Sequence, residues 1–318
     1  MGTLRVPDVV PSPTQDSERL RKAFQGWGTD EKAIIWVLGH RTASQRRKIR
    51  DTYQQLYNES LIDRLQSELS GDFRKAVILW TLDPPERDAN LAREALKSKR
   101  KGVDHLKVIV EMACAASPHH LMAVRQAYCS LYDCSLEEDI TSNVTPPVRK
   151  LLVGLVSSYR YDREVVEEIV AKSEASKLRD AIERKQLDDD DLVWILSTRN
   201  VFQLRATFER YRETYGNPID EHIKRCGTGN LESILRIVVW CIGSPEKHFA
   251  EVVRASIVGF GTDEDSLTRA IVTRAEIDMV KIKEEYFKVN KTTLDYAVID
   301  DTSGDYKDFL ITLLGEKM

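Results

Sequence analysis

The feature of this sequence that most limits its fold is a fourfold internal repeat. Four segments align without gaps so that each ends on a tyrosine, and these tyrosines lie 75, 83 and 75 residues apart. The segments are Arg41–Tyr53, Ala116–Tyr128, Arg199–Tyr211 and Arg274–Tyr286. Such self-similarity is typical of proteins built from repeated supersecondary units. The chain therefore contains four similar units of about 70 residues each.

The pattern within each unit is helical. Apolar residues recur three and four positions apart, as in Ile34, Val37 and Leu38, and β-branched alternation is scarce. Polar residues followed by proline predict helix starts at Ser117–Pro118, Thr145–Pro146 and Ser244–Pro245. The proline-containing first fifteen residues predict an extended tail. We expect an all-α array of four helical bundles.

Composition excludes several classes of protein. The chain has 318 residues, of which 42% are hydrophobic and 31% charged, which is typical of a soluble globular protein. It shows no apolar run long enough to span a membrane and no signal-peptide pattern, so we expect a cytoplasmic protein. The net charge of −4 argues against a nucleic-acid partner. Its five cysteines form no C-x-x-C pair and are expected to be reduced thiols.

Two of the four units share a glycine loop and a distant acid. Gly26 and Gly28 lie 27 and 25 residues before the tyrosine of unit 1, and Gly259 and Gly261 lie at the same offsets in unit 4. Fifteen residues after the tyrosine stand Glu68 and Asp301 in these two units, against Asn143 and Cys226 in units 2 and 3. Units 2 and 3 also lack the glycines, with Lys101 and Val103, and Arg184 and Gln186, in their places. Loop and acid thus occur together or not at all.

This combination suits calcium. Ca²⁺ takes about six to eight oxygen ligands, including backbone carbonyls and carboxylates. A glycine loop can turn the carbonyls of Phe24, Gly26 and Gly28 inward, and Glu68 can close the site. One carboxylate makes a weak site, which a lipid phosphate could complete. The alternative is an ordinary helix start, with Thr29 as its cap and the following acids placed for the helix dipole.

The sequence resembles the annexin family, and in particular its plant branch. The resemblance is carried by G-x-G-T followed about 40 residues later by an acid, and by the segments GWGTDE, VLGHR and WTLDPPERDA. It implies four repeats of five short helices in a slightly curved disc, whose convex face binds acidic phospholipids when calcium is present. The implied division is a tail (1–15), repeat 1 (16–86), repeat 2 (87–158), a connector (159–172), repeat 3 (173–243) and repeat 4 (244–318).

The resemblance also assigns residues to the sites. The implied calcium ligands are the carbonyls of Phe24, Gly26 and Gly28 with the Glu68 carboxylate, and the carbonyls of Ile257, Gly259 and Gly261 with the Asp301 carboxylate. Repeats 2 and 3 should bind no calcium in this way. Trp27 and Phe260 stand between the two glycines of their loops and are expected to enter the membrane interface. The alternative for Trp27 is that its ring folds back on its own repeat.

A second class of function is a redox or calcium-conducting protein that also binds membrane. His40 matches a histidine discussed as peroxidase-like in plant annexins, and Met112, Cys114 and Cys241 match a proposed redox cluster. A hydrogen-bonded histidine near a helix end and buried, inert cysteines are the simpler interpretations. Leu235, Arg236 and Ile237 resemble a proposed actin contact but also suit an ordinary helix. No arrangement of residues indicates catalysis, so we expect a calcium-switched membrane-binding protein that is not an enzyme.

A run of acids, Asp188 to Asp191, superficially resembles a calcium-binding loop. An EF-hand would need glycine at the sixth position and glutamate at the twelfth, where this chain has Val193 and Arg199. Acids in the first turn of a helix are the better interpretation, because they compensate the helix dipole.

Overall fold

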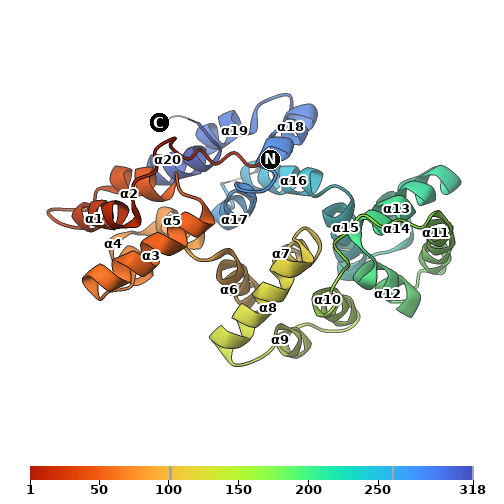
Figure 1. The fold of residues 1–318 in the computed structure, drawn as a ribbon. Coiled ribbons are helices and arrows are strands. Elements are labelled where there is room, and N and C mark those ends of the chain that lie inside the picture. Colours follow the sequence, from red (N-terminus) through yellow and green to blue (C-terminus); the bar gives the residue numbers. More distant parts are fainter. Residues whose placement is uncertain (100–101, 260, 317–318) are drawn as a thin grey trace. The chain divides into compact units, whose positions relative to one another are not determined.

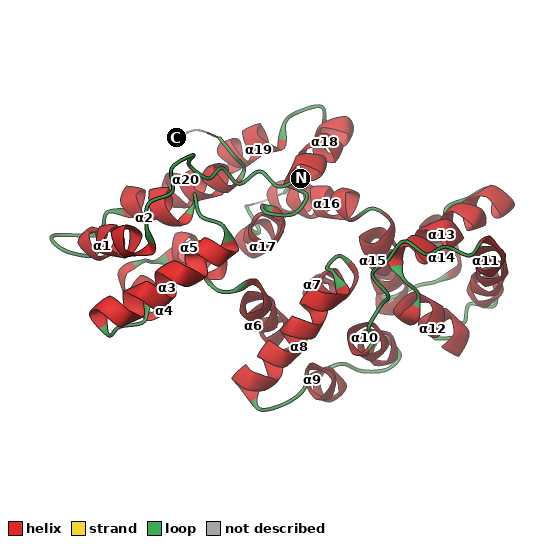
Figure 2. Ribbon diagram, viewed as in Figure 1, coloured by secondary structure: helices red, strands yellow, loops and turns green. Residues whose placement is uncertain are grey.

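The computed structural model describes residues 1–99, 102–259 and 261–316, and every regular element in these ranges is an α-helix. Figures 1 and 2 show that these helices are joined by loops, the longest of which connects α10 to α11, and no strand occurs in the described ranges. The sequence-based expectation of four all-helical repeats with five helices each is confirmed.

The helices follow the repeat order along the chain. Repeat 1 contains α1 (Pro13–Ala23), α2 (Glu31–Leu38), α3 (Ala43–Tyr57), α4 (Leu61–Glu68) and α5 (Gly71–Thr81). Repeat 2 contains α6 (Pro84–Lys97), α7 (Val103–Cys114), α8 (Pro118–Tyr132), α9 (Leu136–Asn143) and α10 (Val148–Ser157). Repeat 3 contains α11 (Glu168–Glu183), α12 (Asp190–Thr198), α13 (Val201–Tyr215), α14 (Ile219–Cys226) and α15 (Asn230–Gly243). Repeat 4 contains α16 (Pro245–Ile257), α17 (Glu264–Arg274), α18 (Met279–Asn290), α19 (Leu294–Asp301) and α20 (Gly304–Leu313).

The chain divides into two compact units. Unit 1 consists of Met1–Arg87 with Phe249–Met318 and therefore combines repeats 1 and 4, while unit 2 is Asp88–His248 and combines repeats 2 and 3. Packing within unit 1 is reciprocal, because α5 of repeat 1 packs on α17 of repeat 4 and α20 of repeat 4 packs on α2 of repeat 1. Both candidate calcium sites thus belong to one unit.

The tyrosines that define the repeat are core residues. Tyr53, Tyr128, Tyr211 and Tyr286 all lie on the third helix of their repeats and are buried. A buried phenol needs a hydrogen-bond partner. The hydroxyl of Tyr53 donates to Glu59 at 3.2 Å, and that of Tyr128 donates to Asp139. The repeat frame is therefore maintained by packing in every repeat and, in repeats 1 and 2, by these polar contacts as well.

In repeats 1 and 3, the arginine found twelve residues before the tyrosine is also structural. Arg41 pairs with Asp16 through two bonds of 2.7 and 2.8 Å, and both side chains are buried. Arg199 forms the corresponding pair with Glu174, again 25 residues earlier in the chain. Removing one partner of a buried ion pair strongly destabilises the fold, because the other charge is left buried and unpaired. These positions therefore require matched charges.

One predicted helix start is wrong. Ser117 caps α8 and Pro118 is its first residue, as expected, and α16 begins at Pro245. However, α10 begins at Val148, not at Pro146. The cause is a second proline at position 147, since the residue before a proline is disfavoured in the helical region.

The N-terminal tail lies on repeat 4 of the same unit. The backbone N–H of Thr3 donates to the carbonyl of Ala275 at 2.8 Å, and its hydroxyl donates to the carbonyl of Leu313 at 2.7 Å. Ser12 caps α1 through a capping box with Gln15. The tail thus connects the first and last repeats. It is shorter than the fifteen residues predicted, because α1 begins at Pro13 after its cap Ser12.

Candidate functional site

The glycines of the two loops have positive φ at matching positions. In the loop between α1 and α2, Gly26 and Gly28 have φ of 111° and 88°, and in the loop between α16 and α17, Gly259 and Gly261 have φ of 144° and 86°. Residues with a Cβ atom rarely adopt these angles. The glycines are therefore required by the loop, whose carbonyl directions they set.

The helix that follows each loop is capped by an aspartate. The side chain of Asp30 accepts the N–H of Ala33 at 3.0 Å, and that of Asp263 accepts the N–H of Ser266 at 3.1 Å. The alternative interpretation, in which Thr29 caps α2, is therefore wrong in this detail, since Asp30 has this role. The hydroxyl of the preceding threonine is therefore not used as a helix cap.

That threonine joins each loop to its distant acid. The Thr29 hydroxyl donates to Glu68 Oε2 at 2.9 Å, and the Thr262 hydroxyl donates to Asp301 Oδ2 at 2.6 Å. Sequence reasoning paired the glycines with the acids but missed the threonines as the link. The signal was available, because both threonines directly follow the second glycine and lie 39 residues before the acid.

The acids occupy an electrostatically unfavourable position. Glu68 is the last residue of α4 and Asp301 is the last residue of α19. The C-terminal end of a helix carries partial negative charge, which disfavours a carboxylate and favours a cation. A cation beside such a carboxylate relieves this repulsion.

The donor set fits calcium in its chemistry. No three His, Cys, Asp or Glu side chains gather as a metal site anywhere in residues 1–99, 102–259 or 261–316. A cation at these loops must therefore be held mainly by backbone carbonyls with one carboxylate, and hard oxygen donors of this kind are preferred by Ca²⁺.

The two loops differ in one respect. In repeat 1, Arg64 pairs with Glu68 at 2.8 Å and also donates to the carbonyl of Phe24 at 3.3 Å. Arg64 was not identified from the sequence, although its position four residues before Glu68 on α4 indicates an ion pair. Asp301 has no cationic partner in the described ranges.

Repeats 2 and 3 replace this arrangement. In repeat 2, Val103 stands at the position that Gly28 has in repeat 1, and it is already the first residue of α7. The side-chain amide of Asn143 donates to the backbone carbonyl of Asp139 at 2.8 Å. Lys101 lies outside the described residues. In the second repeat, the position of the distant acid therefore serves local helix structure.

The side chain of Trp27 is fully exposed at the tip of its loop. It does not fold back on repeat 1, which was the alternative interpretation. Phe260, its counterpart in repeat 4, lies outside the described residues. An exposed indole on a glycine loop has no role in the core of the fold.

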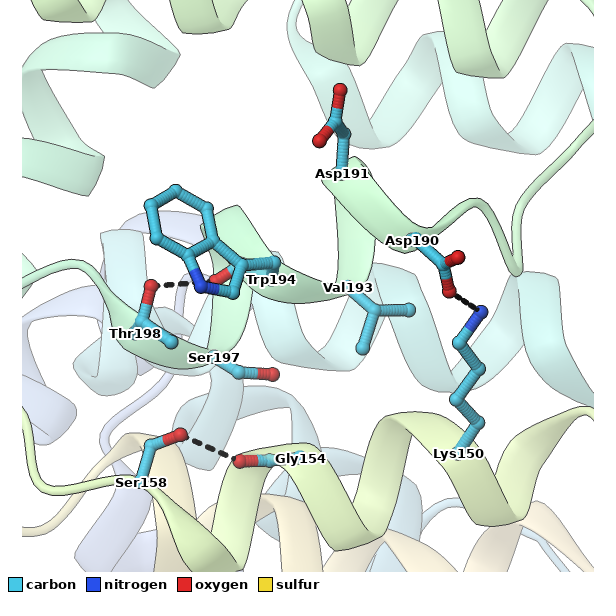
Figure 3. A pocket seen from close by; sticks show the side chains of 9 residues that line it. All are labelled: Lys150, Gly154, Ser158, Asp190, Asp191, Val193, Trp194, Ser197 and Thr198. Carbon is cyan, nitrogen blue, oxygen red and sulfur yellow. Dashed lines mark hydrogen bonds and ion pairs between the residues drawn. The ribbon is translucent and has the colours of Figure 1, made fainter.

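The acidic run of repeat 3 lies at the start of α12, and Figure 3 shows two of its members, Asp190 and Asp191, beside a pocket. Asp189 caps α12 by accepting the N–H groups of Asp191 and Leu192. Asp190 forms an ion pair with Lys150 of α10 across a pocket lined also by Trp194. Asp189 and Asp190 are therefore engaged in a helix cap and an ion pair, in agreement with the interpretation that these acids serve the helix start.

Comparison with known proteins gives the same assignment for the whole chain. The annexin family model matches four segments, residues 15–80, 87–155, 173–238 and 248–313. The chain is a plant-type annexin. It is 58% identical to annexin D3 of Arabidopsis thaliana, with all of both chains covered. Among solved structures, it superposes on annexin III with a TM-score of 0.91 and 33% identity, covering 100% of this chain and 98% of that one. It also superposes on calcium-bound annexin (Sm)1 with a TM-score of 0.86 and 29% identity, covering 99% and 93%.

Annexins in general bind phospholipid in a calcium-dependent manner and are not enzymes. None of the helices in the described part of this annexin is both long and apolar enough to cross a bilayer.

His40 of the annexin is a buried, hydrogen-bonded residue just beyond the end of α2. Its Nδ1 donates to the carbonyl of Trp36 at 3.0 Å, and the two rings lie 4.7 Å apart. The pKa of His40 is lowered, mainly because burial disfavours the charged imidazolium. The hydrogen bond to Trp36 opposes this shift. The imidazole is therefore held neutral against the tryptophan.

The residues of the proposed redox cluster belong to the core of unit 2. Met112, Cys114 and Cys241 are all buried, and α7 packs against α15, which carry them. Burial raises the pKa of the Cys114 thiol to about 11, with Arg160 opposing the shift. The thiolate is the reactive form of cysteine, so this environment suppresses its reactivity.

Replacing both Cys114 and Cys241 with alanine should lower the free energy of unfolding by about 1 kcal/mol per site, because each side chain fills buried volume. Calcium-dependent vesicle binding per folded molecule should not change, since both candidate sites belong to unit 1. Denaturant unfolding and vesicle sedimentation provide the two measurements. Peroxide turnover that is lost on His40→Ala, in protein shown to contain haem, would contradict this view.

The tripeptide that resembles an actin contact is part of the packed helix α15. Leu235 is fully buried, and Arg236 pairs with Glu232 at 3.6 Å. Its first side chain therefore cannot reach a partner without local unfolding.

Proposed function

We propose that this annexin binds acidic phospholipid membranes through two calcium ions. The proposed ligands are the carbonyls of Phe24, Gly26 and Gly28 with Glu68 in repeat 1, and the carbonyls of Ile257, Gly259 and Gly261 with Asp301 in repeat 4. The observation that carries the proposal is the threonine hydroxyl that joins glycine loop to acid in both of these repeats. The calcium-bound structure of a relative supports it at the level of the family.

The incomplete ligand set explains why ion and lipid should bind together. Three carbonyls and one carboxylate leave unfilled about two to four of the six to eight oxygen positions that calcium requires. Phosphate oxygens of an acidic lipid can fill these positions and add negative charge. Each ligand should therefore raise the affinity of the other by the same factor.

The aromatic tips would add apolar binding to this ionic contact. Trp27 is already exposed, so it can enter the interfacial layer without a change in the fold. We assign the same role to Phe260 of repeat 4 from its place in the sequence.

The proposed organisation follows from these sites. Repeats 1 (16–86) and 4 (244–318) bind calcium, and repeats 2 (87–158) and 3 (173–243), joined by the connector 159–172, complete the fold. The protein is proposed to be cytoplasmic, to move to membranes when calcium rises, and to carry out no catalytic turnover. The redox alternative is not favoured by the environment of Cys114, and no described feature favours ion conduction.

Sedimentation with vesicles tests the proposal. The protein should pellet with phosphatidylserine-containing vesicles in the presence of calcium and be released by chelator. It should remain in the supernatant with pure phosphatidylcholine vesicles, or with acidic vesicles without calcium. Equal binding to neutral vesicles would contradict the role of the lipid phosphate charge, and binding without calcium would contradict the role of the ion.

A further inference from the structure

The side chain of Arg64 contacts two of the oxygens proposed as calcium ligands in repeat 1. Nη2 of Arg64 lies 2.8 Å from Glu68 Oε1 and donates to the carbonyl of Phe24 at 3.3 Å. Because Thr29 donates to Glu68 Oε2, both oxygens of the carboxylate are engaged. The guanidinium therefore bridges the loop and the distant acid, as the proposed calcium ion would.

The position of Arg64 is further fixed by its surroundings. Its Nη1 lies 3.6 Å from Glu59, and the guanidinium lies 5.7 Å from the centre of the Phe24 ring. Its Nε is buried and makes no hydrogen bond. The side chain is thus packed into the site and is not a freely moving surface charge.

Repeat 4 lacks this cation. The residue four positions before Asp301 on α19 is Ala297, and, like Arg64, it is partly buried. Asp301 accepts its bond from Thr262 and has no cationic partner in the described ranges. The proposed sites therefore share their loop, threonine and acid but differ in one competing charge.

The difference has an electrostatic consequence. In repeat 1 the guanidinium neutralises a carboxylate at the negative end of α4, so the repulsion that would favour calcium is already relieved. Calcium must break the ion pair and displace a like charge before it can reach the same oxygens. In repeat 4 the repulsion at the end of α19 remains available to drive binding.

We propose that Arg64 is an intramolecular competitor of calcium in repeat 1, so that the repeat 4 site fills at a lower calcium concentration. This inference rests on the proposed function, since it takes both sites as calcium sites. It makes the annexin a two-step sensor: repeat 4 makes the first membrane contact, and repeat 1, with its exposed Trp27, adds to it at higher calcium.

Single-site proteins separate the two steps. Full-length Asp301→Asn retains only the repeat 1 site, and Glu68→Gln retains only the repeat 4 site. The half-maximal calcium concentration for sedimentation with phosphatidylserine-containing vesicles should be lower for Glu68→Gln than for Asp301→Asn. Adding Arg64→Ala to the Asp301→Asn protein should lower its half-maximal calcium about fivefold or more, the factor that corresponds to a partly exposed ion pair of about 1 kcal/mol.

The reciprocal variant and a charge-matched control sharpen the test. Ala297→Arg in the Glu68→Gln protein should raise its half-maximal calcium, because it places a competing cation beside Asp301. Arg212→Ala removes the same charge from an exposed i,i+3 pair with Glu209 in repeat 3 and should leave both values within about twofold.

Hydrogen exchange provides a readout that needs no lipid. Without calcium, Arg64→Ala should increase amide exchange in residues 24–30, because the loop loses its bridge to α4. Adding calcium should restore protection in this variant. Arg212→Ala should leave exchange in these residues unchanged.

Two results would overturn the proposal, and they are distinguishable. If Arg64→Ala leaves half-maximal calcium within about twofold while Glu68→Gln, added to Asp301→Asn, removes binding, then the sites are correct and Arg64 is not a competitor. If Glu68→Gln added to Asp301→Asn leaves binding intact, then the proposed sites themselves are wrong and the inference fails with them.

Discussion

The double variant Glu68→Gln with Asp301→Asn should lose nearly all calcium-dependent binding to acidic vesicles. Each substitution removes the only proposed carboxylate ligand of its site while keeping nearly the same shape. Calcium would be left with neutral oxygens, and charged oxygens provide most of the affinity of such weak sites. Each single variant should show weaker binding, measured as a higher half-maximal calcium in sedimentation.

The equivalent positions in the other two repeats provide matched controls. Asn143→Ala and Cys226→Ala change the residue at the same place in the repeat but should have little effect on vesicle binding. Their repeats lack the glycine loop, and Asn143 bonds to its own helix. Unchanged binding by the double carboxylate variant, or a large loss in these controls, would contradict the assignment of the sites.

Most of the fold could be predicted from sequence because its determinants repeat. The buried tyrosines recur at nearly constant spacing, and the apolar pattern of each unit matches the helical period. The start of α10 was missed because two adjacent prolines give conflicting local signals. Pro146 could begin a helix, but Pro147 disfavours the helical conformation at the residue before it.

The candidate site could be predicted only where its members recur in both repeats. The glycines and acids were found because they occur together in the same two repeats. The N-cap of α2 was misplaced by one residue, at Thr29 instead of Asp30, because threonine and aspartate both cap helices and propensity does not distinguish them. Arg64 was missed because it has no counterpart in repeat 4, where Ala297 stands. Comparison between repeats identifies what they share and is insensitive to a residue that makes them different.

The helical pattern of the sequence does not fix how exposed each tryptophan is. Trp36 and Trp194 lie in apolar helical patterns but are 41% and 51% exposed, whereas Trp80 is fully buried. A helical period indicates which face is apolar but does not determine how fully a neighbouring element covers it. This outcome affects the use of tryptophan fluorescence, because two half-exposed rings besides Trp27 can respond to their surroundings.

Trp27 should contact lipid only when calcium and acidic lipid are both present. Its ring is exposed between two glycines, and the same loop offers the carbonyls proposed to hold the ion. Tryptophan fluorescence should therefore shift to the blue when calcium and phosphatidylserine-containing vesicles are combined, and chelator should reverse the shift. Calcium alone or vesicles alone should have little effect. Trp27→Phe should remove most of the shift, which separates the signal of Trp27 from those of Trp36 and Trp194.

Removing the ring tests its share of the membrane affinity. Trp27→Ala should weaken vesicle binding by about 1.5 to 3 kcal/mol, or roughly ten- to 150-fold, because an aromatic side chain no longer leaves water. Calcium ligation should persist, since the proposed ligands at this loop are backbone carbonyls and Glu68. Trp36→Phe is the matched control, because it removes an indole from α2 without altering the loop. A blue shift that survives in Trp27→Phe would show that the ring does not enter the lipid, and unchanged affinity in Trp27→Ala would show that it contributes nothing to binding.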